Sequence, residues 1–188
     1  MNFCRKKERK KTFAGISQTV GNFDGIDVAI FKIPEQKRIK KGGLSLVLDS
    51  IRDPGNLGTI IRLSDWFSIT NIICSLDTVD CYNPKVIQAT MGSISRVHIN
   101  YCDVKKYLTL SDLPIYAGTM EGKNIYKESL EENAIIVVGN EANGISDAII
   151  NLATHKIGIP QFGRNPQTES LNVAAATAIL LSEFRRLT

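Results

Sequence analysis

The sequence predicts a doubly wound α/β domain over residues 44–188, in which a mostly parallel sheet carries helices on both faces. The first observation is a regular alternation of apolar, strand-like runs with helix-like segments from residue 44 onward. The second is that the apolar cores of two runs, LVL at 46–48 and IIVV at 135–138, are continuous rather than alternating. Continuous apolar strands are typical of sheets that are covered on both faces.

The predicted elements are short and follow one another closely. Strands are expected at 44–51, 70–76, 96–101, 114–120, 134–140 and 155–160. Helices are expected at 57–67, 83–92, 103–110, 143–152 and 169–186. Because ligands of such sheets bind beyond the carboxyl ends of the strands, the turns after residues 51, 120, 140 and 160 are the candidate site positions.

Residues 1–43 do not follow this rhythm, and we interpret them as a basic appendage and linker. They contain one strand-like run, VAIFKIP at 28–34. The net charge of +4 is spread unevenly, because residues 1–41 carry +7 and the rest of the chain −3. The basic clusters at 5–11 and 37–41 are of the kind that attracts phosphate backbones, and a solvated basic tail is the alternative.

The cysteines, histidines and apolar runs argue against several classes of protein. The four cysteines, Cys4, Cys74, Cys81 and Cys102, have no CxxC spacing, and with two histidines in the chain no metal site is expected. Free thiols that are buried or half-buried suit a reducing cytoplasm, so a cytoplasmic protein is expected. No secretory signal is recognised, and no apolar run reaches the roughly 18 residues of a membrane span, so no membrane partner is expected.

The first candidate site stretch is RDPGNLGTIIR at 52–62, a Pro/Gly turn followed by a helix. Asn56 is expected to cap this helix, whose free N–H groups would favour an anion. Gly58 lies one turn before Arg62, which would leave room for a ligand to approach the arginine. The stretch lacks the lysine of a P-loop and the spacing of GxGxxG. An ordinary capped helix with a surface arginine is the alternative.

The second candidate stretch is VVGNEANGIS at 137–146, where a buried strand runs into a glycine-containing loop. Gly139 would let a flat ligand lie against the backbone. Glu141, at the end of the strand, would bond a hydroxyl or hold an arginine. A plain strand-to-helix loop capped by Asn143 or Ser146 is the alternative.

The third candidate stretch, at 159–186, is a strand end, a polar loop and a helix. Ser170 and Asn172 open this helix, whose later faces are almost wholly apolar. Its alanines permit close packing in a core or against a partner helix. Helix caps are the alternative interpretation of the two polar residues.

Together, in this order and spacing, the three stretches resemble the motifs of the SpoU/TrmH family of the SPOUT superfamily, which are S-adenosylmethionine-dependent RNA 2′-O-ribose methyltransferases. The first family motif is Asn-x-Gly followed by an arginine, the second is Gly-x-Glu-x-x-Gly, and the third is Ile-Pro, a loop and Ser-Leu-Asn. The resemblance covers about residues 44–187. The matching residues are Asn56, Gly58 and Arg62, then Gly139, Glu141 and Gly144, then Ile159, Pro160, Ser170, Leu171 and Asn172.

The resemblance implies a fold, a cofactor and an assembly. The family fold is a SPOUT-type α/β sheet whose C-terminal part forms a trefoil knot, and the knotted loops bind S-adenosyl-L-methionine. Family members are homodimers that pack through the knot region. The expected domains are an appendage at 1–43, similar to the end of a substrate-binding domain, and a methyltransferase domain at 44–188. The residues expected by position to line the cofactor pocket are Thr119, Gly139, Ile159 and Leu171.

The resemblance also implies a ribose 2′-hydroxyl of structured RNA as the methyl acceptor, with ribosomal RNA favoured over transfer RNA. The family assigns the arginine of the first motif to this hydroxyl. Because a guanidinium stays protonated in proteins, Arg62 is expected to stabilise a developing alkoxide rather than to act as a base. Asn56 and Glu141 are expected to position the arginine or the ribose, and Ser170 and Asn172 to complete the catalytic site.

The chain departs from the family pattern in two places. Gly163 and Ser170 are separated by RNPQTE, which is about twice the usual family length for this loop. Arg164 on the longer loop is expected to be exposed, with a contact to RNA phosphate as the alternative. Residues 1–43 are shorter than the separate RNA-binding domain that many members carry.

Two other functions compete with this interpretation. A Rossmann-type dehydrogenase would need a glycine fingerprint after the first strand, and GNLG lacks its spacing. A non-catalytic RNA-binding or ribosome-assembly module that keeps the fold is the alternative to an enzyme. The presence of Arg62, Glu141 and Asn172 favours the enzyme, and failure to bind S-adenosylmethionine would favour the module.

Overall fold

The computed structural model describes residues 16–23, 26–31, 33, 39, 42–69, 71–163 and 170–186. The chain divides into two units, residues 1–36 and 37–188. The domain boundary between residues 43 and 44 stays a prediction. No helix in the described part of the chain is long and apolar enough to cross a membrane.

The first unit contains a two-stranded antiparallel sheet. Its strands are β1 (Ile16–Phe23) and β2 (Ile26–Phe31), with Ile16 opposite Phe31 and Phe23 opposite Ile26. β2 overlaps the predicted strand at 28–34, whereas β1 was not predicted. The β1 sequence ISQTVGNF mixes polar and apolar residues and contains a glycine, so the strand signal in its own residues is weak.

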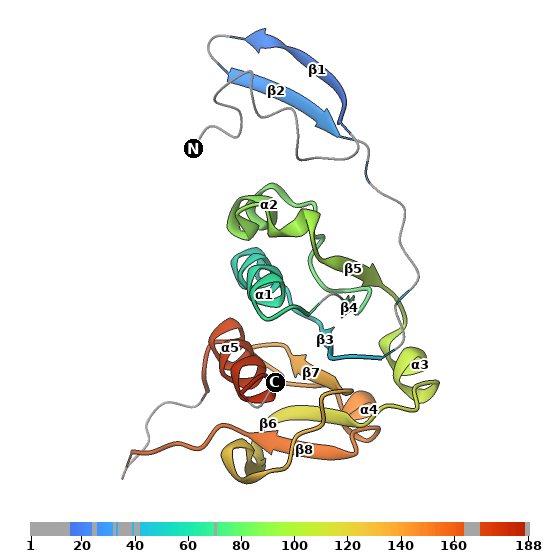
Figure 1. Ribbon diagram of the computed structural model, residues 1–188, viewed down its shortest axis with the longest axis vertical. Helices are drawn as coiled ribbons and strands as arrows, with labels where there is room; N and C mark the ends of the chain where they lie inside the picture. The colour runs from blue at the N-terminus through green and yellow to red at the C-terminus, as the bar shows by residue number, and fades with distance from the viewer. Residues whose placement is uncertain are drawn as a thin grey trace. The chain divides into compact units, whose positions relative to one another are not determined.

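The second unit is built on a six-stranded sheet in which all the described strands pair in parallel, in the order β5-β4-β3-β7-β6-β8 (Figure 1). The strands are β3 (Ser45–Asp49), β4 (Asn71–Cys74), β5 (His98–Tyr101), β6 (Ile115–Asn124), β7 (Ile135–Gly139) and β8 (His155–Gly158). The helices are α1 (Pro54–Trp66), α2 (Pro84–Thr90), α3 (Val104–Thr109), α4 (Asp147–Ile150) and α5 (Val173–Phe184), with 3-10 turns η1 (Ser93–Ser95) and η2 (Ile125–Lys127). The predicted α/β fold is confirmed.

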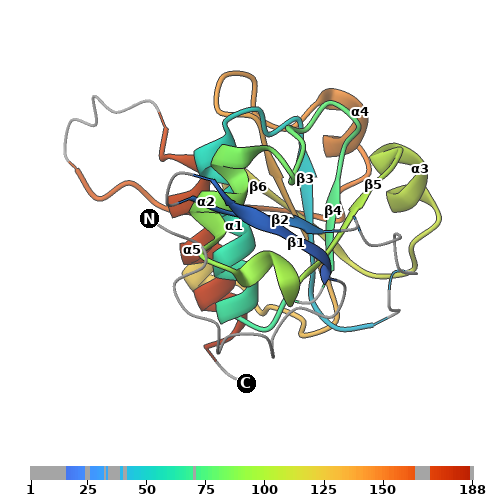
Figure 2. The same cartoon turned by 90° about the horizontal axis from the view of Figure 1, so that it is seen from above.

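Helices cover both faces of this sheet. Figure 2 shows α1, α2 and α5 on one side and α3 and α4 on the other. Leu46 and Leu48 of β3 belong to the core cluster of the first side, and Val47 belongs to the cluster of the second side. All five residues of β3 are buried. Its apolar run is continuous because each of its two faces packs against helices.

Several element boundaries differ from the prediction, and three of these differences lie near the candidate stretches. β6 does not end at residue 120 but runs to Asn124, because it pairs again with β8 after a shift in register. The helix expected at 143–152 is reduced to α4, because Asn140 and Gly144 close a tight turn with two backbone hydrogen bonds of 3.0 and 2.8 Å. α1 begins at Pro54 rather than at residue 57.

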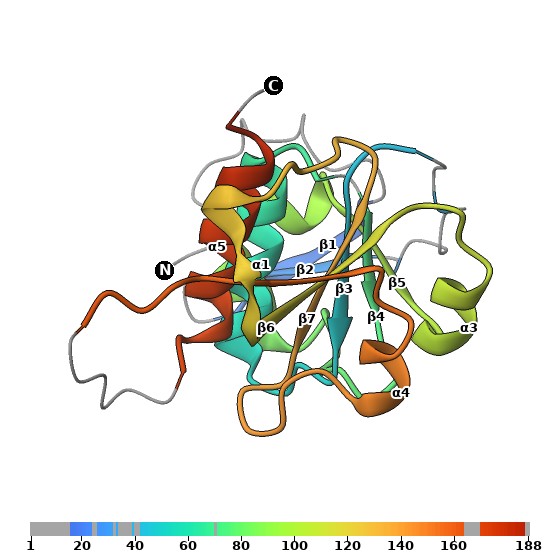
Figure 3. The same cartoon turned by 90° about the horizontal axis from the view of Figure 1, so that it is seen from below.

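The starts of α1 and α5 lie at one end of the sheet. Asn172, at the start of α5, bonds Asn56 in the first turn of α1. At the other end of the same helix pair, Arg185 Nε donates to the Phe67 carbonyl at 3.1 Å. The two helices therefore run in the same direction. Figure 3 shows that the turn after β7 lies at this end of the sheet as well.

Candidate functional site

The N-terminus of α1 is capped by Asp53 and not by Asn56. The Asp53 carboxylate accepts the backbone N–H of Asn56 at 2.7 Å, and Pro54 occupies the first turn of the helix. The prediction that Asn56 is the N-cap was therefore wrong. With the cap supplied three residues earlier, the Asn56 side chain has no local bond to make and is free for contacts outside the helix.

One chain of hydrogen bonds joins residues from all three candidate stretches. Asn56 Nδ2 donates to Glu141 Oε1 at 2.5 Å, and Asn56 Oδ1 accepts from Asn172 Nδ2 at 2.9 Å. Asn172 caps α5, its Oδ1 accepting the N–H groups of Ala174 at 2.9 Å and Ala175 at 3.2 Å. Since the cap uses the Asn172 oxygen, its amide nitrogen faces Asn56, and this orients the Asn56 amide so that it donates to the carboxylate.

The Arg62 and Ser170 side chains are exposed and take no part in these hydrogen bonds. Arg62 lies on α1 six residues after Asn56, and Ser170 lies two residues before Asn172. Within the described part of the chain, neither side chain makes a hydrogen bond or an ion pair. The structure thus brings together Asn56, Glu141 and Asn172, and leaves the Arg62 guanidinium available to a ligand.

Two glycines of the candidate stretches pack closely against other residues of the protein. A Cβ on Gly58 would lie 2.4 Å from the Ala89 Cβ and 2.9 Å from the Val86 carbonyl oxygen, so this glycine allows α1 to pack closely on α2. A Cβ on Gly139 would lie 2.2 Å from the Gly144 carbonyl carbon. The space that a side chain would take at both glycines is filled by the protein itself. At Gly58 this contradicts the prediction that the missing side chain leaves room for a ligand beside Arg62. At Gly139 the predicted contact between a flat ligand and the backbone stays a prediction.

Three of the four predicted cofactor-pocket residues lie on neighbouring segments of the sheet. Thr119 is in β6, Gly139 ends β7, and Ile159 directly follows β8. The parallel register of β6 with β7, continued by two residues, places Thr119 level with Gly139. The Thr119 carbonyl oxygen approaches Gly158 so closely that a Cβ there would lie 2.7 Å away, and Ile159 follows directly. Thr119 Oγ1 is buried and lacks a hydrogen-bond partner in the described part of the chain. Leu171, 50% exposed, precedes α5.

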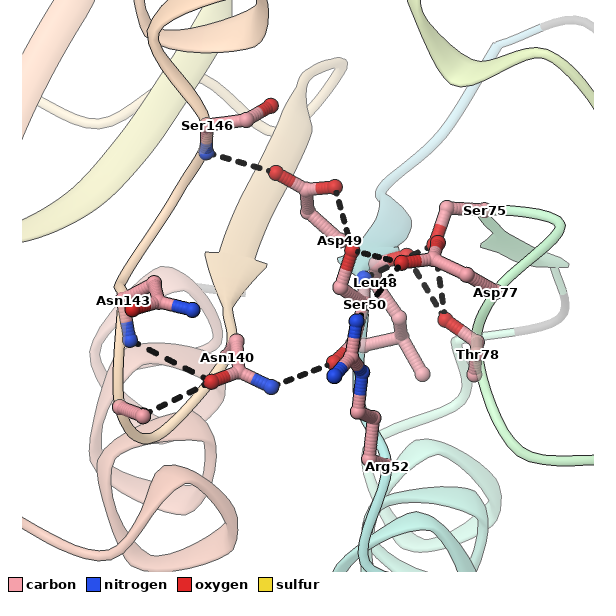
Figure 4. Close-up of polar contacts among 11 residues, drawn as sticks. Leu48, Asp49, Ser50, Arg52, Ser75, Asp77, Thr78, Asn140, Asn143 and Ser146 are labelled. Carbon is pink, nitrogen blue, oxygen red and sulfur yellow. Dashed lines mark hydrogen bonds and ion pairs between the residues drawn. The ribbon is translucent and has the colours of Figure 1, made fainter.

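A polar network supports the turn between β3 and α1 (Figure 4). Ser50 N donates to Ser75 Oγ at 2.8 Å, and Ser50 Oγ donates to Asp77 Oδ2 at 2.6 Å. The hydrogen bonds from Ser50 and then Ser75, rather than the Arg52 guanidinium at 3.8 Å, are the main reason that the pKa of Asp77 lies below its usual value. Asp49, 4% exposed, accepts Ser146 N at 2.8 Å from the turn after β7.

Sequence reasoning missed several residues that build the site. Asp53 carries a local signal, because an aspartate directly before a proline is typical of a helix start. Asp49 and Asn140 carry no such signal, since their partners are 97 and 90 residues away along the chain.

The described cysteines make none of the side-chain hydrogen bonds of this site. Cys74 and Cys81 are buried and Cys102 is half-buried, all as free thiols, while Cys4 lies outside the described residues. Burial raises the pKa of all three thiols, that of Cys81 to about 11. Within the described residues, no group of three or more His, Cys, Asp or Glu side chains is placed to hold a metal ion. Arg164 and the loop 164–169 also lie outside the described residues.

Two surface hollows are remote from the candidate residues. One, of about 300 Å³, is lined by Trp66, Phe67, Ser68 and Arg185 at the far ends of α1 and α5. The other, of about 500 Å³, lies between the ends of α3 and α4 and includes His155. Neither is lined by a predicted catalytic or cofactor-binding residue.

Comparison with known proteins gives one consistent family. The sequence model of the SpoU rRNA Methylase family matches residues 43–182. The 23S rRNA (guanosine(2553)-2′-O)-methyltransferase RlmP of Bacillus subtilis (strain 168) is 30% identical over 161 residues, which are 84% of this chain and 63% of that protein.

Solved structures agree with this result. A putative RNA methyltransferase of the TrmH family from Porphyromonas gingivalis superposes with a TM-score of 0.78 and 39% identity, over 85% of this chain and 66% of that one. An AdoMet-bound rRNA methyltransferase from Sinorhizobium meliloti superposes with a TM-score of 0.74 and 29% identity, over 86% and 63%. The chain therefore spans 63 to 66% of the length of these three proteins.

Proposed function

This chain belongs to the SpoU rRNA methylase family, and from that premise we propose that it transfers a methyl group from S-adenosyl-L-methionine to a ribose 2′-hydroxyl of structured RNA. The observation that carries the proposal is the hydrogen-bonded chain from Glu141 through Asn56 to Asn172. These residues come from three separate stretches of sequence. Two side-chain hydrogen bonds join them, although Glu141 follows β7, Asn56 lies in α1 and Asn172 directly precedes α5. The exposed Arg62 guanidinium lies on the same helix as Asn56.

Ribosomal RNA is the proposed substrate class in preference to transfer RNA. The names of the Bacillus subtilis and Sinorhizobium meliloti relatives, which both specify rRNA, support this choice. The basic clusters at 5–11 and 37–41, which lie largely outside the described residues, would add a sequence-independent attraction to phosphate. A cytoplasmic location follows as part of the same proposal.

The proposed cofactor site is the edge formed by Thr119, Gly139, Ile159 and Leu171. The Thr119 hydroxyl is buried and has no partner among the described residues, which fits such a site because a buried polar group is normally hydrogen-bonded and a ligand would supply the missing bond. Leu171 and the half-buried Ile159 offer apolar surface to an adenine-sized ring. When bound there, S-adenosylmethionine supplies an electrophilic methyl group on a sulfonium leaving group.

The protein's part in the reaction is to position the 2′-hydroxyl and to help it lose its proton. We assign the second task to Arg62. A guanidinium remains protonated, so it lowers the pKa of the hydroxyl by stabilising negative charge on the 2′-oxygen, and the proton passes to water. Asn56 and Glu141 orient the ribose or the arginine, and Ser170 and Asn172 complete the site.

A homodimer that packs through the knot region, and the trefoil knot itself, belong to this proposal as well. The start of α5 supports close approach of a second helix, because Ala175 is exposed and Ala176 and Ala178 are half-buried, and all three side chains are small. The methyltransferase domain is assigned to residues 44–188 and the appendage to residues 1–43.

The test is transfer of labelled methyl groups to unmodified total RNA by the parent protein, Arg62→Ala and Arg96→Ala. Arg96 is an exposed arginine, but Asp65 already neutralises it at 2.6 Å. We expect Arg62→Ala to lower the rate by on the order of 100-fold with S-adenosylmethionine affinity unchanged, and Arg96→Ala to stay near the parental rate. Equal rates for the parent and Arg62→Ala would refute the role of Arg62. A parent that binds no S-adenosylmethionine would indicate the non-catalytic module.

A further inference from the structure

Asn140 connects the turn after β7 to the turn after β3 (Figure 4). Its Nδ2 donates to the Ser50 carbonyl at 2.8 Å. Its Oδ1 accepts the backbone N–H groups of Ala142 at 2.8 Å and Asn143 at 3.3 Å. The two ends of one amide therefore have different tasks, since the oxygen shapes the local turn and the nitrogen reaches across to another segment.

The carbonyl that receives this bond belongs to a firmly held residue. Ser50 has a φ of +60°, a conformation that residues other than glycine adopt infrequently. Bonds from Ser50 to Ser75 and Asp77 stabilise it, and Ser75 in turn bonds Thr78 at 3.0 Å. The acceptor of the Asn140 hydrogen bond is therefore a backbone carbonyl whose position is fixed by other hydrogen bonds.

The turn that carries Glu141 is attached on both sides. At its start, the Asn140 side chain bonds the Ser50 carbonyl. After its end, the buried Asp49 carboxylate accepts the N–H of Ser146 at 2.8 Å. Glu141 itself is exposed, and an exposed glutamate has many rotamers. Its 2.5 Å contact with Asn56 consequently depends on where the backbone of the turn is held.

We propose that Asn140 is a positioning residue that sets Glu141 opposite Asn56 through its bond to the Ser50 carbonyl. The inference rests on the proposed function, because Glu141 and Asn56 matter to catalysis only if methyl transfer takes place at this site. Loss of the bond lets the turn move relative to α1. A shift of about 1 Å in a catalytic group lowers a rate by on the order of 100-fold.

The variant that separates the two tasks is Asn140→Asp. Aspartate keeps an oxygen for the N–H groups of Ala142 and Asn143 but has no donor for the Ser50 carbonyl. The matched control is Asn83→Asp, which makes the same change at a residue whose Oδ1 accepts Lys85 N at 2.9 Å at the start of α2. Both variants are compared with the parent protein and with Glu141→Ala, which removes the acceptor for Asn56 Nδ2.

Two readouts decide the inference. Hydrogen exchange is expected to be faster at residues 50–56 in Asn140→Asp and unchanged there in Asn83→Asp. The kcat of Asn140→Asp is expected to fall by on the order of 10- to 100-fold, with little further loss when it is combined with Glu141→Ala, because both act through one contact. If Asn140 had a structural role alone, its substitution would lower the stability of the protein, and the effects of the substitutions at 140 and 141 on kcat would multiply.

Unchanged exchange at residues 50–56, or multiplicative effects of the two substitutions on kcat, would overturn the inference. Absence of methyl transfer by the parent protein would count against the proposed function instead. In that case the exchange rates would still decide whether Asn140 fixes the two turns relative to each other.

Discussion

Asn172 combines a structural task with a proposed catalytic one, and two substitutions can separate the two. Its Oδ1 caps α5 by accepting the N–H groups of Ala174 and Ala175, and its Nδ2 donates to Asn56. Replacing it by alanine removes the cap, which costs about 1 kcal/mol, and one side-chain hydrogen bond worth about another 1 kcal/mol. For a chain of this size we expect Tm to fall by about 4–8 °C.

Asn172→Asp keeps the cap, because aspartate is as good an N-cap as asparagine and its charge suits the helix N-terminus. The substitution places a second carboxylate beside Asn56, whose single amide nitrogen cannot donate well to both this new carboxylate and that of Glu141. The side chains at 141 and 172 are exposed to water, so the stability cost stays below about 1 kcal/mol. The Asn56–Glu141 contact is weakened nonetheless, and methyl transfer is expected to fall by on the order of 10-fold or more.

The assay pairs thermal unfolding with methyl transfer for the parent protein and both variants. The expected pattern is a lowered Tm for Asn172→Ala, a nearly parental Tm for Asn172→Asp, and reduced transfer for both. Full transfer activity in Asn172→Asp would refute the catalytic part of the reasoning. An unchanged Tm in Asn172→Ala would refute the capping part.

Two further predictions concern packing and the thiols. Gly58→Ala places a methyl group 2.4 Å from the Ala89 Cβ, and urea unfolding should show a loss of about 1–3 kcal/mol; an unaltered midpoint would mean that α1 and α2 are less tightly packed than described. In a Cys4→Ser background, iodoacetamide should modify the folded protein slowly at pH 8, because burial holds the pKa of the remaining thiols above their ordinary values, and rapidly after denaturation. Fast modification of the folded protein at pH 8 would contradict that burial.

The central strands were predictable because their signals are local. β3 and β7 are buried on both faces, and this alone requires the continuous apolar runs seen in the sequence. β6 beyond residue 120 was not predictable in the same way. Its sequence there, EGKN, has no strand pattern, and it is extended because it pairs with β8 more than 30 residues later.

The residues of the candidate site could be predicted in part, whereas their contacts with one another could not. Resemblance to a family identified Asn56, Glu141 and Asn172, but no local pattern places these residues together, because their contacts span 85 and 116 residues. Gly58 was misinterpreted since the space beside it is taken by α2, a helix that the stretch 52–62 does not reveal. Asn56 was misinterpreted as a cap although Asp53, directly before Pro54, already had the stronger local signal.

The central claim is that the joined motifs form a site for methyl transfer to a ribose oxygen. The most direct measurement is nucleoside analysis of unmodified ribosomal RNA after incubation with S-adenosylmethionine and either the parent protein or Arg62→Ala. The account predicts a 2′-O-methylnucleoside in the parent reaction that is absent or strongly reduced with Arg62→Ala. A methyl group found on a base, or equal amounts of 2′-O-methylnucleoside from both proteins, would contradict it.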